Sequence, residues 1–365
     1  MRRAEARVEA YTPAGQCTNR ASATGMRVEH FCGAPCEWDD FVRRQDGWSH
    51  FHLFGWKHVV ERVFDHECIY LAARDRAGRL TGVLPLVRVR SRLFGHYLVS
   101  MPFVNYGGPL GEARGISELI RYATSFVPVD GIKLLELRSR SALPLPLPAS
   151  HRKITVLLPL PRGDADALWK GFDSKVRSQI RRPQKEGVTV RFGADQLEPF
   201  FEVFSRHMRD LGTPTQPRRW FEALADQFPD DAWFGCAYHH GRPVAAGCGF
   251  HWGAELEMTW ASALSEYKRV APNMLLYWSF MERAVANGVE TFNFGRCTPG
   301  SGTHRFKRQW GAQDVPLWWY DLSRTPGVTT PSPTDGAYAW GPRVWKHLPV
   351  PVATSIGPSV VRCIP

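Results

Sequence analysis

The order of the predicted helices and strands constrains the fold of this chain most, because the same order occurs twice. In each half, helices come first, a meander of antiparallel strands follows, and one helix and one further strand complete the unit. No residue-level repeat accompanies this order, so the duplication rests on the order of elements alone. The pattern predicts an α/β protein with mixed sheets that contains the same kind of unit twice.

Hydrophobic periodicity places the elements of both halves. In the first half we expect helices at 38–42, 56–64 and 116–126, and strands at 69–73, 80–89, 133–137 and 154–158. In the second half we expect helices at 165–182, 197–211, 219–228 and 274–287, and strands at 233–238, 244–251, 255–261 and 291–294. Residues 74–79 have the composition of a hairpin turn, and Gly288 is a helix-ending signal.

The chain has 365 residues, more than one hydrophobic core usually organises. We expect a mobile tail at 1–25, an N-terminal domain at 26–163, a C-terminal domain at 164–324, and a Pro/Gly-rich appendage at 325–365. The tail has no apolar core of a secretory signal, and no stretch reaches the roughly 18 to 20 apolar residues of a membrane span. The appendage is expected to pack on the surface or to contact a membrane face.

Charge and cysteine content limit the partners. Lys and Arg number 46 against 35 Asp and Glu, so the net charge is +11, which attracts phosphate-bearing partners or anionic membranes without choosing between them. The eight cysteines lack the paired spacing of a zinc site, so we predict no metal. Cysteines in apolar strands point to buried thiols in a reducing cytoplasm.

The segment 292–311 is the strongest candidate for chemistry. A short β-run delivers the chain into a glycine-rich loop, and a cationic stretch follows that includes Arg296, Arg305 and Lys307. Loops at strand ends often carry sites because a rigid sheet positions them. Glycines let the backbone approach a ligand closely, and the cations suit phosphate or a developing oxyanion. A solvated basic loop is the alternative.

A resemblance favours the first interpretation. Phe292-Asn293-Phe294-Gly295-Arg296, followed by Phe306-Lys307-x-x-Trp310-Gly311, resembles the C-terminal signature of the FemAB family, in the GNAT acyltransferase superfamily. The likeness is closest to the subgroup of PEP-CTERM/exosortase and exopolysaccharide systems. Further matching strings begin at 82, 91, 100, 106, 210 and 357, so the resemblance covers about 38 to 365.

The resemblance implies two tandem GNAT-like domains, with the acyl-transfer site in the second. FemAB proteins move an amino acid from aminoacyl-tRNA to the amine of a peptidoglycan precursor. By resemblance, this chain would be an acyltransferase that moves an aminoacyl or acyl group to an amine or hydroxyl of a peptidoglycan, exopolysaccharide or other cell-envelope precursor. Its expected place is the cytoplasm, with peripheral contact to the inner membrane face; tRNA and a lipid-linked or saccharide precursor are the candidate partners.

The same resemblance assigns residue roles. Lys307, with Phe306 beside it, corresponds to the acyl-transfer position, where a fixed ammonium would stabilise an oxyanion. Arg296 and Arg305 suit phosphates of donor or acceptor, and His304 is the histidine near enough to act as a base. The other expected substrate contacts are Asn293, Trp310, Thr213 and Tyr106. Relatives tend to have Asp where this chain has Asn293 and Ser where it has Cys297, which weakens a general-base role at 293.

Residues 269–273 bear on the choice of acyl donor. Acetyl-CoA-dependent relatives cradle pyrophosphate on backbone N–H groups of a glycine-rich loop before a helix. This chain has Arg269-Val270-Ala271-Pro272-Asn273 there, and Pro272 has no N–H to donate. We therefore expect no permanently bound cofactor and favour aminoacyl-tRNA over acyl-CoA as donor. An acyl-CoA-dependent N- or O-acyltransferase and a non-catalytic GNAT-fold scaffold remain the alternatives.

A basic helix forms the last candidate. Val176 and Ile180 lie four residues apart and would be buried, which leaves the neighbouring cations outside. These cations could guide tRNA or a diphosphate-linked lipid, or could form an ordinary solvated face. They are Lys175, Arg177, Arg181 and Arg182.

Overall fold

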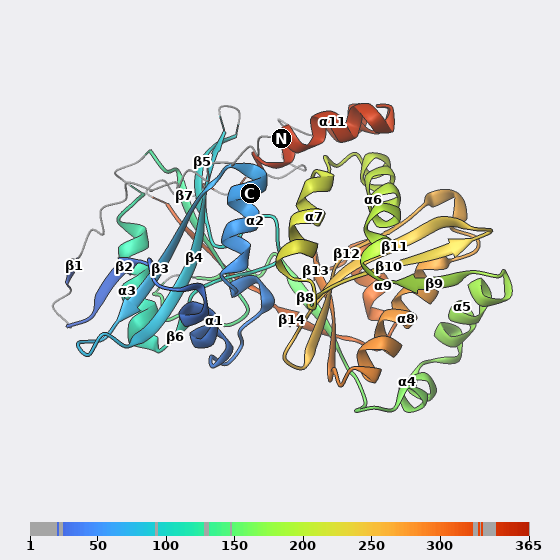
Figure 1. The fold of residues 1–365 in the computed structure, drawn as a ribbon, viewed down its shortest axis with the longest axis horizontal. Helices are drawn as coiled ribbons and strands as arrows, with labels where there is room; N and C mark the ends of the chain where they lie inside the picture. Colours follow the sequence, from blue (N-terminus) through green and yellow to red (C-terminus); the bar gives the residue numbers. More distant parts are fainter. Residues whose placement is uncertain are drawn as a thin grey trace, which may run out of the picture.

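The computed structural model describes residues 20–21, 25–91, 94–127, 131–146, 148–323, 328, 330 and 341–364 (Figure 1). Apart from residues 20, 21 and 25, the expected tail at 1–25 lies outside this part. So do residues 92 and 93 of one matching string and much of 324–340. Two sheets with their helices stand side by side in Figure 1, joined by packing of α2 (Gly55–Phe64) against α7 (Arg218–Gln227).

The first sheet has the strand order β1-β2-β3-β4-β5-β7-β15, with β6 paired to β4. Its strands are β1 (Arg20–Ala21), β2 (Arg27–His30), β3 (Glu67–Arg74), β4 (Leu80–Ser91), β5 (Gly95–Val99), β6 (Leu110–Gly111), β7 (Leu134–Ser139) and β15 (Trp318–Leu322). One face packs against α1 (Pro35–Arg43) and α2 (Gly55–Phe64), and the other against α3 (Ala113–Thr124). Figure 1 shows α3 and α2 on opposite sides of this sheet.

The second sheet has the order β14-β8-β13-β12-β11-β10-β9. Its strands are β8 (Ile154–Pro159), β9 (Thr189–Phe192), β10 (Ala232–His239), β11 (Arg242–Trp252), β12 (Glu255–Ala263), β13 (Thr291–Cys297) and β14 (Gln313–Pro316). The helices α6 (Leu197–Leu211) and α7 (Arg218–Gln227) pack on one face, and α4 (Ala165–Gly171), α5 (Ser174–Lys185) and α8 (Pro272–Ala286) on the other.

Each sheet contains one parallel pair in an otherwise antiparallel order. In the first sheet β5 pairs with β7 in parallel, and α3 lies between them in the chain. In the second sheet β12 pairs with β13 in parallel, and α8 lies between them. A crossover helix is the usual way to join parallel strands. The expected repeat of a mixed-sheet α/β unit is therefore confirmed.

The two halves exchange strands across the expected boundaries. Residue 163 was expected to end the first domain, yet β8 pairs with β13 and β14 of the second sheet, and its apolar side chains lie in the second core. Conversely, β15 falls before 324 but pairs with β7 of the first sheet. The division of the chain at these boundaries stays a prediction. The sheets show in addition that β8 and β15 each pair with strands of the other half.

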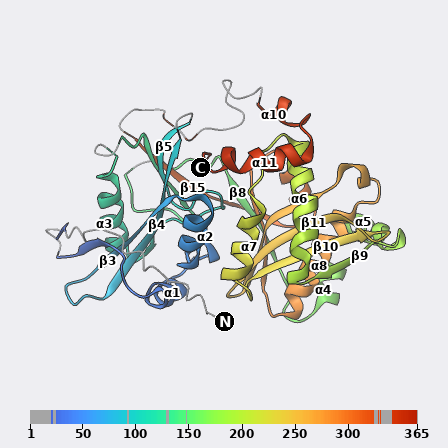
Figure 2. The ribbon, with the colours of Figure 1, turned by 45° about the horizontal axis from the view of Figure 1, so that its top comes forward.

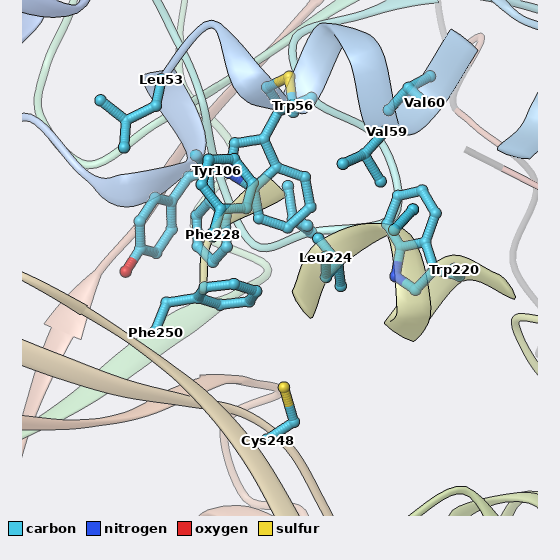
Figure 3. Close-up of a cluster of buried hydrophobic side chains, with 14 of the residues drawn as sticks. Leu53, Trp56, Val59, Val60, Tyr106, Trp220, Leu224, Phe228, Cys248 and Phe250 are labelled. Carbon is cyan, nitrogen blue, oxygen red and sulfur yellow. The ribbon is translucent and has the colours of Figure 1, made fainter. Parts of the chain in front are cut away.

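One apolar core runs between the halves. Trp56 of α2 lies 6.0 Å from the ring of Trp220 on α7 and 5.3 Å from that of Phe250 on β11. Figure 3 shows these rings together with Tyr106 and Phe228, drawn from both halves. Such continuous packing favours a fixed arrangement of the two sheets.

Most of the expected helices and strands are confirmed to within a few residues. The helix expected at 165–182 is instead two helices, because Phe172 is extended (ψ 147°) and ends α4 before α5 begins. The helix α9 (Gly302–Arg308) was not expected, and neither were seven short strands, β1, β2, β5, β6, β9, β14 and β15.

The appendage forms two helices where it is described, α10 (Gly341–Trp345) and α11 (Val350–Val361). Figure 2 shows α11 lying across the top of α6 and toward the first half. Within the described residues, none of the helices combines the length and apolar character that crossing a bilayer requires. Among the same residues, no group of three or more His, Cys, Asp and Glu is placed to hold a metal.

Candidate functional site

Lys307 is buried against a bulge of β13. The register of β13 against β8 shifts between Asn293 and Arg296, and Gly295 in this bulge has a φ of 72°. A Cβ at Gly295 would lie 2.9 Å from the Met258 carbonyl oxygen, so only glycine fits. The short helix α9 directs Lys307 back to the bulge, where Nζ donates to the carbonyl oxygens of Gly295 (2.7 Å) and Arg296 (3.0 Å).

Burial changes the chemistry of this ammonium. The Lys307 residue is 4% exposed, and desolvation lowers its pKa to about 8. A lysine ammonium has three N–H donors, and two are used at the bulge. Within the described part of the chain, the third donor has no hydrogen-bond partner. Lys307 can therefore still donate to an oxygen brought beside it.

A fully buried carboxylate joins the two sheets. Glu257 on β12 accepts hydrogen bonds from the Asn105 amide and the Tyr106 hydroxyl of the first half. It also accepts from Asn293 Nδ2 (3.1 Å) and from the half-buried Thr259 hydroxyl (3.3 Å). Burial raises the pKa of Glu257 to about 7, against the hydrogen bonds, which lower it. This carboxyl group can thus gain or lose a proton near neutral pH.

Asn293 completes this network. Its Nδ2 lies 2.7 Å from Glu255 Oε1, 3.1 Å from Glu257 Oε2 and 2.8 Å from the Tyr106 hydroxyl oxygen. Its Oδ1 accepts from the Thr155 hydroxyl (2.6 Å) and from the Gly295 N–H (2.8 Å). A carboxylate here would supply no donor and would add a third negative charge. The Asn in place of the Asp of relatives is therefore explained by its two acidic neighbours.

Arginines surround Trp319 beside this network. The guanidinium carbons of Arg138, Arg152 and Arg296 lie 4.6, 4.5 and 5.2 Å from the centre of the Trp319 ring. Glu136 accepts from both Arg138 and Arg152, each at 2.6 Å. Two of the three cations are therefore paired.

Arg296 is the unpaired member of this cluster. Among the described residues, no carboxylate pairs with it. Burial and then the charge of Arg138 lower its pKa to about 9. Among the residues that the structure describes, the buried Trp319 indole N–H also has no acceptor. An unpaired cation and an unused donor on the same ring form a candidate anion site.

The remaining residues of segment 292–311 serve the local fold. Phe306 and Trp310 pack against Tyr277, with ring centres 5.0 and 6.2 Å away, and Trp310 is almost fully buried. His304 Nδ1 accepts from the Gly300 N–H (2.9 Å), and its Nε2 lies 3.0 Å from Asp314. The base role expected for His304 stays a prediction that would cost one of these bonds.

The structure separates the other predicted residues from this site. Arg305 donates to the Gly300 carbonyl oxygen (2.8 Å) at an exposed turn. Thr213 lies in the loop that α10 and α11 cover, because a Cβ at Gly212 would meet Pro342, and Gly357 lies against Thr215. Tyr106, Asn293, Arg296 and Lys307 are the predicted residues that the structure brings to the region between the sheets.

The basic helix is α5, and burial of Val176 and Ile180 is confirmed. Arg177 donates to the Phe172 and Lys170 carbonyl oxygens, so it caps the end of α4. Arg181 lies 5.2 Å from the Trp169 ring centre. Lys175, Arg181 and Arg182 are exposed.

Several polar residues of this region were missed by sequence reasoning. Glu255 and Glu257 stand two apart in an expected strand, so they share one face, and two acids on a strand flanked by apolar residues are a detectable signal. Arg140 and Arg152 gave no comparable signal, because their carboxylate partners are on strands far away in the chain, and Arg138 was missed although its partner Glu136 lies two residues before it on β7. Arg140 pairs with Glu255 at 2.9 Å.

The helix that could hold a CoA pyrophosphate does not fit it. The residue before α8, Ala271, has a φ of 58°, and Pro272 is the first residue of the helix. Pro272 has no N–H, and the Met274 N–H already donates to the Ala271 carbonyl oxygen (3.0 Å). Fewer backbone N–H groups are therefore free at this helix terminus to bind a pyrophosphate.

Known proteins give the fold a context. Residues 171–308 match the model of the acetyltransferase (GNAT) domain. The crystal structure of FemX is similar with a TM-score of 0.62 at 14% identity, over 80% of this chain and 97% of that one. A tandem GNAT protein from the clavulanic acid biosynthesis pathway has a TM-score of 0.52 at 14% identity, over 80% and 95% of the two chains.

L-PGS from Bacillus licheniformis has a TM-score of 0.50 at 11% identity, over 91% of this chain and 97% of that one. No curated protein matches the sequence. The chain thus has the GNAT acyltransferase fold, in the tandem arrangement of FemX and the tandem GNAT protein.

Proposed function

We propose that this protein is an aminoacyltransferase of FemAB type, which moves an aminoacyl group from aminoacyl-tRNA to an amine of a peptidoglycan or exopolysaccharide precursor. The observation that carries the proposal is the buried Lys307 ammonium at the β13 bulge, of which one N–H has no hydrogen-bond partner among the described residues. The GNAT domain match and the FemX-like fold support acyl transfer. The signature at 292–311 supports the FemAB type and its PEP-CTERM-associated subgroup.

The reaction has a simple balance. The acceptor nitrogen attacks the ester carbonyl carbon, so a C–N bond forms and negative charge develops on the carbonyl oxygen. The ester C–O bond then breaks, and the tRNA hydroxyl leaves. The third N–H of Lys307 would donate to the developing oxyanion in a site with little water, where one such donor contributes roughly 3 to 4 kcal/mol.

The attacking amine must also lose a proton. Glu257 is a suitable acceptor, because burial places its pKa at about 7. Its four hydrogen-bond partners block direct access, but the half-buried Thr259 hydroxyl touches Glu257 Oε1. We infer that the proton moves through Thr259 to Glu257, and finally to the leaving oxygen. Glu257 takes the base role that loss of the carboxylate at 293 left open.

The anion site suits a phosphate of the donor or of a lipid-linked acceptor. Within the described part of the chain, the Arg296 guanidinium pairs with no carboxylate, and the Trp319 indole N–H would supply a further donor on the same ring. Bidentate guanidinium contacts are well matched to phosphate oxygens. The exposed cations of α5 would guide the tRNA backbone toward the second sheet. Contact with the cytoplasmic membrane face would bring the protein to a lipid-linked precursor.

The test is Lys307→Met, assayed as transfer of labelled amino acid from charged tRNA to extracted cell-envelope precursors. We expect transfer to fall by about 10² to 10³, the cost of one lost oxyanion donor, with the circular dichroism spectrum unchanged. Lys133→Met, which removes an exposed lysine of the first half, is the matched control. Unchanged turnover of Lys307→Met rejects the proposal, and equal turnover with acetyl-CoA as donor rejects the assignment of aminoacyl-tRNA.

A further inference from the structure

Exposed apolar side chains gather on one part of the surface. Within the described residues, the exposed large hydrophobic side chains are Leu211 (52%), Val344 (54%), Val352 (42%) and Ile356 (43%). Leu211 ends α6, Val344 belongs to α10, and the other two belong to α11. The helices α10 and α11 pack on α6, and Figure 2 shows the three together.

The outer face of α11 carries no charge. Ala353 and Gly357 face inward, and a Cβ at Gly357 would lie 3.0 Å from Thr215. Val352 and Ile356 lie one turn apart on the exposed side, and Val350–Val361 contains no charged residue at all. A helix on a protein surface normally turns charged residues to water. The outer face of α11 is therefore suited to an apolar environment.

Positive charge surrounds this face. Arg343 and Lys346 precede α11 and are exposed, and Arg362 directly follows it. Residues 341–365 contain no Asp or Glu. Apolar residues flanked by Lys and Arg are typical of helices that lie at the surface of an anionic bilayer.

The dimensions also favour an in-plane position. The 12 residues of α11 extend about 18 Å, which is less than the roughly 30 Å of a bilayer core. A second copy of the chain is a weaker fit, because four half-exposed side chains offer far less than the roughly 800 Å² per partner of a standard interface. Arg343, Lys346 and Arg362, in a segment without Asp or Glu, would also repel their copies across a twofold axis.

We propose that α10, α11 and the end of α6 form a docking surface for an anionic lipid bilayer. Leu211, Val344, Val352 and Ile356 enter the boundary between headgroups and acyl chains, while Arg343 and Lys346 contact lipid phosphates. This docking needs no acyl transfer, so it is testable apart from the proposed function.

The experiment measures binding of the full chain to sedimented vesicles of phosphatidylcholine with and without phosphatidylglycerol. We expect binding to the anionic vesicles. The double variant Val352→Asp with Ile356→Asp should bind them roughly tenfold or more weakly, because two charges replace aliphatic groups that enter the bilayer in the bound state. Arg343→Gln with Lys346→Gln is expected to lose about fivefold for each charge removed, on anionic vesicles only.

The matched control is Ala77→Asp with Ser117→Asp, which adds the same two charges at exposed positions of the first half and should bind as the wild type does. If the aspartate pair at 352 and 356 impairs folding, the charge pair at 343 and 346 still decides the outcome. Failure of the wild type to bind anionic vesicles overturns the proposal. So does a self-association in solution that the aspartate pair abolishes while vesicle binding is unaffected.

Discussion

Glu257→Gln tests whether the buried carboxyl group between the sheets titrates near neutral pH. The substitution keeps the shape of the side chain and removes its charge. Burial is the main cause that raises the pKa of Glu257 to about 7 from 4.5, while the Tyr106 and Asn105 hydrogen bonds oppose the rise. Glutamine cannot take up this proton, so the variant isolates the contribution of one titration to stability.

The sign and size follow from linkage. The pKa of Glu257 is higher in the folded chain than in the unfolded chain, so its contribution to stability is fully present below about pH 4.5 and is lost as pH rises through about 7. The rise of the Glu257 pKa from 4.5 to about 7, at about 1.4 kcal/mol for each tenfold change in proton affinity, makes the loss roughly 3 to 4 kcal/mol. The wild type should lose this amount between about pH 4.5 and pH 8, and the variant should not.

The assay is urea unfolding of both proteins, followed by tryptophan fluorescence across this pH range. The difference in the free energy of unfolding between variant and wild type should change by roughly 3 to 4 kcal/mol in favour of the variant as pH rises. Glu186→Gln, which removes an exposed carboxylate, should follow the wild-type curve. If the free energy of unfolding of Glu257→Gln and of the wild type changed in parallel with pH, burial would not raise the pKa of Glu257.

Three further outcomes follow from the same region. Asn293→Asp removes two hydrogen bonds to carboxylates, so at pH 8 it should lower the free energy of unfolding by roughly 3 to 6 kcal/mol. The loss should be smaller at pH 5, where a carboxyl group can regain a proton. Urea unfolding at both pH values checks this. Arg296→Gln should raise the Tm by roughly 2 to 4 °C in a thermal melt, the effect of about 1 kcal/mol, while transfer activity falls. The pH–rate profile of transfer should be bell-shaped, rising to about 7 as Glu257 loses its proton and falling above about 8 as Lys307 loses its own; a flat profile contradicts both roles.

Local patterns in the sequence were enough to predict most elements, and the pairing of strands was beyond them. The helical spacing of Val59 and Val63 and the alternation in the long strands are local signals, and the helices and strands there agree with prediction. The place of β8 and β15 in opposite sheets depends on backbone pairing with β13 and with β7, far away in the chain. No local pattern distinguishes a strand that stays with its neighbours from one that crosses.

The site shows the same division between local and distant information. The signature at 292–311 led to Lys307, and its burial follows from Gly295, whose backbone bulge places two carbonyl oxygens beside α9. The titrating carboxyl group, Glu257, was missed because the burial that raises its pKa arises only where the two halves meet, at Tyr106 and Asn105. Trp310 was expected to touch substrate, and the structure buries its ring in the second core. A large aromatic residue suits either role, so the residue type alone does not distinguish them.

The charges around β13 bear on function more directly than any single residue. Lys153, Arg296 and Lys307 all have lowered pKa values, each first because of burial, and Arg296 contributes to lowering the other two. Holding like charges out of water in this way destabilises the folded chain. Glu136 and Glu257 offset this only in part, because the pKa of Arg296 stays lowered to about 9 and Glu136 is already shared between Arg138 and Arg152. A bound anion would restore pairing to these cations and would stabilise the fold by an amount that rises with the logarithm of the anion concentration above its Kd. Inorganic pyrophosphate should therefore raise the Tm of the wild type more than that of Arg296→Gln; an equal rise in both would show that the anion binds elsewhere.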